Sequence, residues 1–159
     1  MSLKRGQMIA EARKSIAELS PAKVKALLDC REIDLILDIR EANEWAEAHI
    51  PGSVHAARGR LEWLADPSYE NNMSELAGHC EKRIVVYCNG GGRALLAAQT
   101  LQRMGFSHVA SMAGGYRRWK ETGLPSHPPT CLGDQVGLSG GCDRPALASG
   151  SAASSPREE

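Results

Sequence analysis

Residues 84–94 of this 159-residue chain read IVVYCNGGGRA. The run 84–87 has the composition of a buried β-strand, because Ile, Val and Tyr favour the pleated, packed surface of a sheet. Cys88 stands where that strand ends, and four small residues precede an Ala/Leu-rich helix predicted over 93–105. A strand that passes through a short glycine-rich loop into a helix is typical of an α/β fold.

The rest of the chain repeats this alternation. Further strands are predicted over 35–39, 53–56 and 109–112. Further helices are predicted over 8–16, from the capping pair Ser20-Pro21, over 41–49, and from Gly114-Gly115. Strands that alternate with helices pair in parallel and are covered on both faces, so the expected class is α/β.

The carboxyl end of the chain differs from the rest. More than half of residues 126–159 are Gly, Pro, Ser or Ala, without an aromatic residue. Such a segment buries too little apolar surface to offset the entropy of ordering it. We therefore expect an N-terminal helical extension over 1–15, a folded domain over 16–125 and a flexible tail over 126–159. Cys131 and Cys142 lie in this tail, where they could accept sulfur from Cys88.

Composition excludes several classes of function. The chain has 19 Lys plus Arg residues and 19 Asp plus Glu residues, so its formal net charge is zero. A neutral chain has no overall positive field to attract nucleic acid. The sequence has no apolar run long enough to span a bilayer, and charges interrupt the amino end where a signal peptide needs apolar residues. Five cysteines without a staple-like spacing fit a reducing compartment. We expect a cytoplasmic protein that needs no metal ion or organic cofactor and has no nucleic-acid or membrane partner.

The loop after Cys88 has the composition of an anion cradle. Gly90, Gly91 and Gly92 allow the backbone to curl so that several N–H groups point towards one centre. The helix start adds a partial positive charge and Arg93 adds a full one. These features favour a thiolate over a thiol and make Cys88 a candidate nucleophile. Because no Gly-Lys-Ser/Thr follows, the loop is not a nucleotide-binding P-loop.

Several fragments in this order resemble the rhodanese-like sulfurtransferase family, over roughly residues 16–125. The fragments are LILDIR at 35–40 with Glu41 and Glu44, HIPGS at 49–53, the loop 88–93, MGF at 104–106, and GGY at 114–116 with Trp119. The resemblance implies a central parallel sheet of about five strands, flanked by helices on both faces. It also implies a catalytic cysteine that opens a six-residue loop, the length of 88–93.

The resemblance further implies a thiosulfate sulfurtransferase. Cys88 would take the outer sulfur of thiosulfate or of a persulfide donor and pass it, as a persulfide, to a thiol or protein acceptor. Asn89, Gly90, Gly91, Gly92 and Arg93 would bind the substrate. Arg93 has a second interpretation, in which it braces the loop by binding carbonyl groups.

Three further residues belong to the expected site. Asp38 and Arg40 end a strand on the same sheet edge as Cys88, and by resemblance they shape the pocket wall. Arg40 also stands four residues before Glu44, so the two could simply pair. Arg58 follows the strand predicted over 53–56, and by resemblance it lies near the pocket, where it would attract anionic thiosulfate.

Two other functions use similar parts. Cysteine-dependent phosphatases and arsenate reductases also combine a cysteine, a backbone cradle and an arginine, but their loops typically place five residues between Cys and Arg, where this chain has four. The second alternative is a persulfide carrier or regulatory module that uses the fold without thiosulfate turnover. A retained Cys88 favours the carrier over an inactive module.

Overall fold

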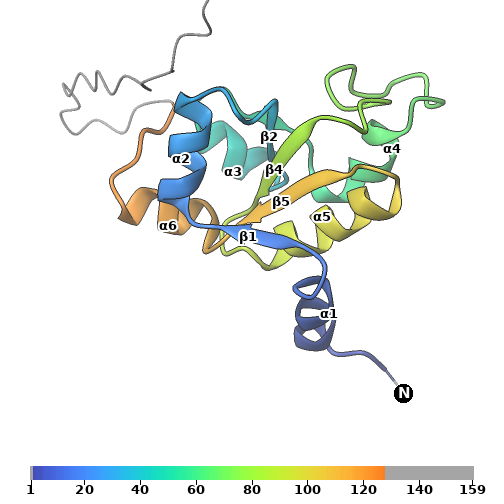
Figure 1. The fold of residues 1–159 in the computed structure, drawn as a ribbon, viewed down its shortest axis with the longest axis horizontal. Coiled ribbons are helices and arrows are strands. Elements are labelled where there is room, and N and C mark those ends of the chain that lie inside the picture. The colour runs from blue at the N-terminus through green and yellow to red at the C-terminus, as the bar shows by residue number, and fades with distance from the viewer. Residues whose placement is uncertain (1, 128–159) are drawn as a thin grey trace, which may run out of the picture.

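A computed structural model describes residues 2–127, and its strands form one parallel sheet (Figure 1). The expected tail, with Cys131 and Cys142, therefore lies almost wholly outside the described residues. The strand order is β1-β5-β4-β2-β3, and every pairing is parallel. The strands are β1 (Ala17–Leu19), β2 (Leu35–Asp38), β3 (Val54–His55), β4 (Arg83–Tyr87) and β5 (His108–Met112). The predicted α/β fold with a five-stranded parallel sheet is confirmed.

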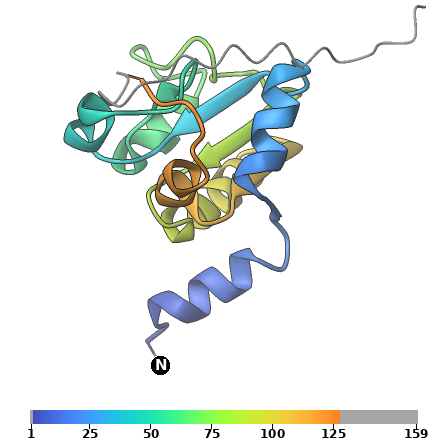
Figure 2. The same cartoon turned by 90° about the vertical axis from the view of Figure 1, so that its left-hand side faces the viewer.

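Helices cover both faces of the sheet (Figure 2). They are α1 (Arg5–Ala12), α2 (Pro21–Asp29), α3 (Ala42–Glu47), α4 (Leu61–Ala65), α5 (Gly92–Arg103) and α6 (Gly115–Glu121), with a 3-10 turn η1 (Arg58–Arg60) before α4. On one face, α5 packs on β4 and β5 with α1 and α4 beside it, and α2 packs with α6 on the other. No helix within residues 2–127 is both long enough and apolar enough to cross a membrane.

The pleat of β4 decides which face Cys88 meets. Ile84, Val86 and Cys88 belong to the core on the α5 side, whereas Val85 and Tyr87 belong to the core on the α6 side. This alternation follows from the two-residue period of an extended strand. Cys88 therefore continues the apolar row of β4 and emerges beside the start of α5.

The sequence located most elements but missed two short ones. The capping pair begins α2 as expected, and Ser20 Oγ accepts a hydrogen bond of 3.2 Å from the Lys23 backbone N–H. By contrast, β1 and α4 were not predicted. Only three residues long, β1 pairs at the sheet edge with β5, so no long apolar run marks it. The first helix begins at Arg5, three residues before the predicted start.

Helix α1 packs on the domain rather than standing free. Ala12 at its end and Ile16 after it are buried in the α5-side core, and Ile9 packs against that core from the rim. These three residues anchor the amino-terminal segment beside α5.

An ion pair where β2 and β4 begin makes the stability of the domain depend on pH. Arg83 donates to the Asp34 carboxylate from its backbone N–H at 2.8 Å and from its guanidinium at 3.0 and 3.1 Å. These hydrogen bonds lower the pKa of Asp34 to about 2. Because the folded-state pKa lies below the unfolded value, this stabilisation is present above about pH 4 and is lost as the pH falls towards 2.

We expect thermal unfolding to reveal this linkage. Between pH 5 and about pH 2, the melting temperature of Asp34→Asn should fall less steeply than that of the wild type. Asp66→Asn is the comparison variant: hydrogen bonds from Ser68 also lower the pKa of Asp66, so it shows how much a surface carboxylate without a cation partner contributes. Parallel curves for wild type and Asp34→Asn would show that the Asp34–Arg83 pair does not carry the pH dependence.

Candidate active site

Cys88 follows β4 directly and is only 1% exposed. Its Sγ accepts a hydrogen bond of 3.1 Å from the backbone N–H of Gly91. Because α5 begins at Gly92, the sulfur also lies at the positive end of a 12-residue helix. A hydrogen-bond donor and a helix N-terminus both stabilise negative charge on sulfur, so the structure supplies what a nucleophilic thiolate needs.

The start of α6 holds the Cys88 loop in place. The backbone N–H of Tyr116 donates to the Cys88 carbonyl at 2.7 Å, and that of Arg117 donates to the Asn89 carbonyl at 3.1 Å. This approach depends on Gly115, whose φ is +61°. A Cβ atom there would stand 2.3 Å from the Cys88 carbonyl oxygen, so no other residue fits without displacing the loop.

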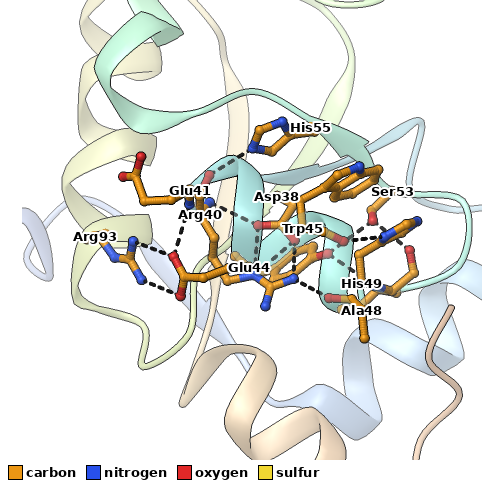
Figure 3. A network of polar contacts seen from close by, with 12 residues as sticks. Asp38, Arg40, Glu41, Glu44, Trp45, Ala48, His49, Ser53, His55 and Arg93 are labelled. Atoms are coloured by element: carbon orange, nitrogen blue, oxygen red, sulfur yellow. Dashed lines mark hydrogen bonds and ion pairs between the residues drawn. The ribbon is translucent and has the colours of Figure 1, made fainter. Parts of the chain in front are cut away.

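Arg93 binds a carboxylate from another helix. Its guanidinium donates to the Glu44 carboxylate of α3 at 3.2 and 3.3 Å (Figure 3). Burial raises the pKa of Glu44, but hydrogen bonds from Arg93 and from the Glu41 backbone N–H outweigh it, so the pKa is lowered. Arg93 therefore links the loop to α3 through the Glu44 side chain. Within residues 2–127 its guanidinium donates to no carbonyl group, which was one of its two predicted roles.

A cavity of about 430 Å³ opens at Cys88. The residues that line it are Arg5, Ile9, Arg13, Cys88, Gly90, Gly92, Arg93 and Leu96. Three of these side chains carry a positive charge and none is a carboxylate, which favours an anionic ligand. Within residues 2–127, no group of three His, Cys, Asp or Glu side chains is arranged to hold a metal ion.

Asp38 and Arg40 form a buried pair. The Arg40 guanidinium donates to the Asp38 carboxylate at 2.6 Å and to the Ala48 carbonyl at 2.7 Å. The central carbon (Cζ) of the Arg40 guanidinium lies 4.2 Å from the centre of the Tyr116 ring, which is within cation–π distance. Tyr116 belongs to the core on the α6 side, so this pair supports the sheet edge from the face opposite α5.

Neither residue of that pair lines the Cys88 cavity. Arg40 lines a separate cavity of about 270 Å³, which also reaches Asn89 of the loop and Glu44. The suggested pairing of Arg40 with Glu44 does not form as a direct contact, because Asp38 binds Arg40 and Arg93 binds Glu44.

The structure does not bring Arg58 to the Cys88 cavity. Its guanidinium binds the Glu62 carboxylate at 3.0 Å and donates to the Thr100 hydroxyl at 3.2 Å. Arg5 and Arg13 line the cavity instead, and sequence reasoning missed both. The available signal was their spacing, because residues 5, 9 and 13 recur every four positions and so share one helix face.

Comparison with known proteins decides the family. The sequence model of the rhodanese-like domain family matches residues 20–122. The chain belongs to the rhodanese-like domain family. The predicted family is thereby confirmed, and this rhodanese-like domain is similar to proteins concerned with sulfur transfer.

Two relatives illustrate that range. The chain is 35% identical over 116 residues to YrkF of Bacillus subtilis, which carries the provisional name of sulfur carrier protein, and covers 57% of its length. That alignment includes 73% of the chain. The chain is also 31% identical over 113 residues to the thiosulfate sulfurtransferase GlpE of Coxiella burnetii. This alignment includes 71% of the present chain and 91% of GlpE.

Solved structures of other proteins have the same fold. A Rhodopseudomonas palustris protein of unknown function, described as a possible tyrosine phosphatase, aligns with a TM-score of 0.73 and 36% identity. The alignment covers 79% of this chain and 95% of that one. The human single-domain sulfurtransferase TSTD1 aligns with a TM-score of 0.58 and 25% identity, over 67% of this chain and 97% of that one.

The contact between Gly115 and Cys88 predicts a large effect of one methyl group. Gly115→Ala should destabilise the domain by at least about 3 kcal/mol, because strain at positive φ adds to a clash with backbone. Chemical denaturation monitored by circular dichroism measures this change.

Gly123→Ala is the matched control. Gly123 also has positive φ, +71°, but a Cβ there would meet nothing within 4 Å. It should cost only about 1 kcal/mol. Equal losses for the two variants would mean that backbone conformation alone, and not the approach to Cys88, requires Gly115.

Proposed function

We propose that this rhodanese-like domain is a sulfurtransferase that carries sulfane sulfur as a persulfide of Cys88. The observation that supports it best is the position of Cys88 in a cavity lined by three arginines, with the Gly91 N–H directed at its sulfur. Thiosulfate and persulfides are anions with an electrophilic outer sulfur, so this cavity attracts the donor and places it beside the nucleophile.

The first half-reaction loads Cys88. Its thiolate attacks the outer sulfur of thiosulfate, a new S–S bond forms, and the bond between the two donor sulfurs breaks. Sulfite leaves with the electron pair, and Cys88 becomes a persulfide that keeps one negative charge. The backbone N–H groups of residues 89–93 and the positive end of α5 stabilise that charge, which now lies on the outer sulfur of the persulfide.

The second half-reaction returns Cys88 to its thiolate. An acceptor thiolate or cyanide attacks the terminal sulfur of the persulfide and forms a persulfide or thiocyanate. The S–S bond to Cys88 breaks, and its electron pair stays on the cysteine. Charge balances in both steps, so neither requires a general acid, and the cavity supplies none among its lining residues.

Two observations support the alternative functions. Similarity to a provisionally named sulfur carrier supports an acceptor that is a protein, with thiosulfate turnover secondary. The Rhodopseudomonas palustris protein, described as a possible tyrosine phosphatase, supports the phosphatase alternative. Against it, only four residues separate Cys88 from Arg93, and Glu44 already occupies the Arg93 guanidinium.

Steady-state turnover tests the proposal. With thiosulfate and cyanide, the wild type should form thiocyanate, and Cys88→Ser should lower kcat/KM at least about a thousandfold because the persulfide cannot form. Cys80→Ser is the control, since Cys80 is a free cysteine away from the cavity and should keep wild-type turnover.

The same preparations separate the alternatives. Persulfide transfer to a thiol without thiosulfate turnover would assign the chain as a carrier. Hydrolysis of p-nitrophenyl phosphate that depends on Cys88, with no transfer from any sulfane donor, would overturn the proposal in favour of a phosphatase.

A further inference from the structure

Helix α1 lies outside residues 20–122, which match the family, yet it reaches the reactive cysteine. Arg5, Ile9 and Arg13 all line the cavity that contains Cys88. Residues four apart lie on one side of an α-helix, so one face of α1, extended by its C-cap residue Arg13, forms this wall. In Figure 1, α1 is the dark blue helix on the α5 side of the sheet.

Packing fixes α1 over the first turn of α5. Ala12 and Ile16 are buried in the core of that face. Ile9 approaches so closely that a Cβ atom at Gly92 would stand 3.0 Å from its Cδ1 atom. Gly92 thus has a second role besides the loop, because its missing side chain leaves room for α1 to close the cavity.

The two arginines of this wall differ in whether a carboxylate binds them. The Arg5 guanidinium makes no hydrogen bond or ion pair within residues 2–127, whereas Arg13 pairs with Glu18 at 2.5 Å and is 57% exposed. Arg93, on the opposite wall, is held by Glu44. Arg5 is therefore the cavity cation whose guanidinium is not already satisfied by a carboxylate, and Arg13 retains donors of its own.

We propose that α1 is the outer wall of the active site, and that Arg5 and Arg13 bind the anionic group of the sulfur donor. The inference rests on the proposed function and extends it to the substrate. The donor carries a negative group, a sulfonate or carboxylate, beside its transferable sulfur. A volume of about 430 Å³ falls in the range of small-molecule sites, and Ile9 and Leu96 offer apolar contact to a carbon-containing donor.

Donor kinetics test the proposal directly. The probes are thiosulfate, a dianion, and methanethiosulfonate, a monoanion that yields the same Cys88 persulfide and releases methanesulfinate. Arg5→Gln and Arg13→Gln should each raise the KM for thiosulfate about threefold or more, with a smaller rise for methanethiosulfonate. Because neither arginine contacts the transferred sulfur, kcat should change less than about twofold.

Matched variants show whether charge is the cause. Arg5→Lys and Arg13→Lys should restore most of the affinity, since they keep the positive charge. Arg103→Gln removes an exposed arginine from the far end of α5 and should leave both KM values unchanged. An unchanged thiosulfate KM in Arg5→Gln/Arg13→Gln, or an equal rise in Arg103→Gln, would overturn the proposal.

Alkylation of Cys88 gives a readout that does not require sulfur transfer. Iodoacetate is anionic and iodoacetamide is neutral, so the ratio of their rates at Cys88, followed by peptide mass spectrometry, reports the local potential. The ratio should fall about threefold for each arginine removed, and added salt should reduce this difference.

The two readouts separate the two claims. A ratio that falls while no persulfide forms with any donor would contradict the proposed function but keep the anion-binding wall. Persulfide formation with an unchanged ratio and an unchanged KM would keep the sulfurtransferase and remove the role of α1. Chemical denaturation should show wild-type stability for each variant, because both side chains lie at the surface.

Discussion

Two backbone hydrogen bonds, from the start of α6 to the loop after β4, determine the geometry of this site. The amides of Tyr116 and Arg117 bind the carbonyls of Cys88 and Asn89. With these carbonyls satisfied, the chain turns at Gly91 and enters α5, and the Gly91 N–H meets the cysteine sulfur. The missing side chain of Gly115 permits this approach. The Cys88 sulfur is thus positioned by the backbone that follows two neighbouring strands, β4 and β5, at one end of the sheet.

The arginines near Cys88 fall into two groups, one buried in the packing of the domain and one lining the cavity. Arg40 is buried against Asp38 and an aromatic ring, so its charge is used for packing on the α6 side. Arg93, Arg13 and Arg5 surround the cavity on the α5 side. Arg93 is paired with Glu44 and Arg13 with Glu18, whereas the Arg5 guanidinium has no carboxylate partner within residues 2–127. A chain of zero formal charge therefore presents a locally positive site. A binding site depends on where charges are placed and paired, which the net charge does not describe.

Local patterns in the sequence were enough to predict the centre of the site. Cys88, its glycine loop and the following helix are adjacent in sequence, so their juxtaposition needs no tertiary information. The Glu44–Arg93 pair joins residues 49 apart, and the placement of Arg5 depends on how α1 packs. Arg58 shows the converse error, because a neighbour four residues later, Glu62, binds it locally. Sequence patterns resolve neighbours along the chain, whereas these contacts are set by packing between elements.

The central claim is that Cys88 itself carries the sulfur. A single turnover with thiosulfate and no acceptor tests this most directly, with intact-protein and peptide mass spectrometry. We expect a mass gain of about 32 Da on the peptide that contains Cys88, with about one equivalent of sulfite released. Sulfur found on another cysteine, or sulfite release without a modified Cys88, would contradict it.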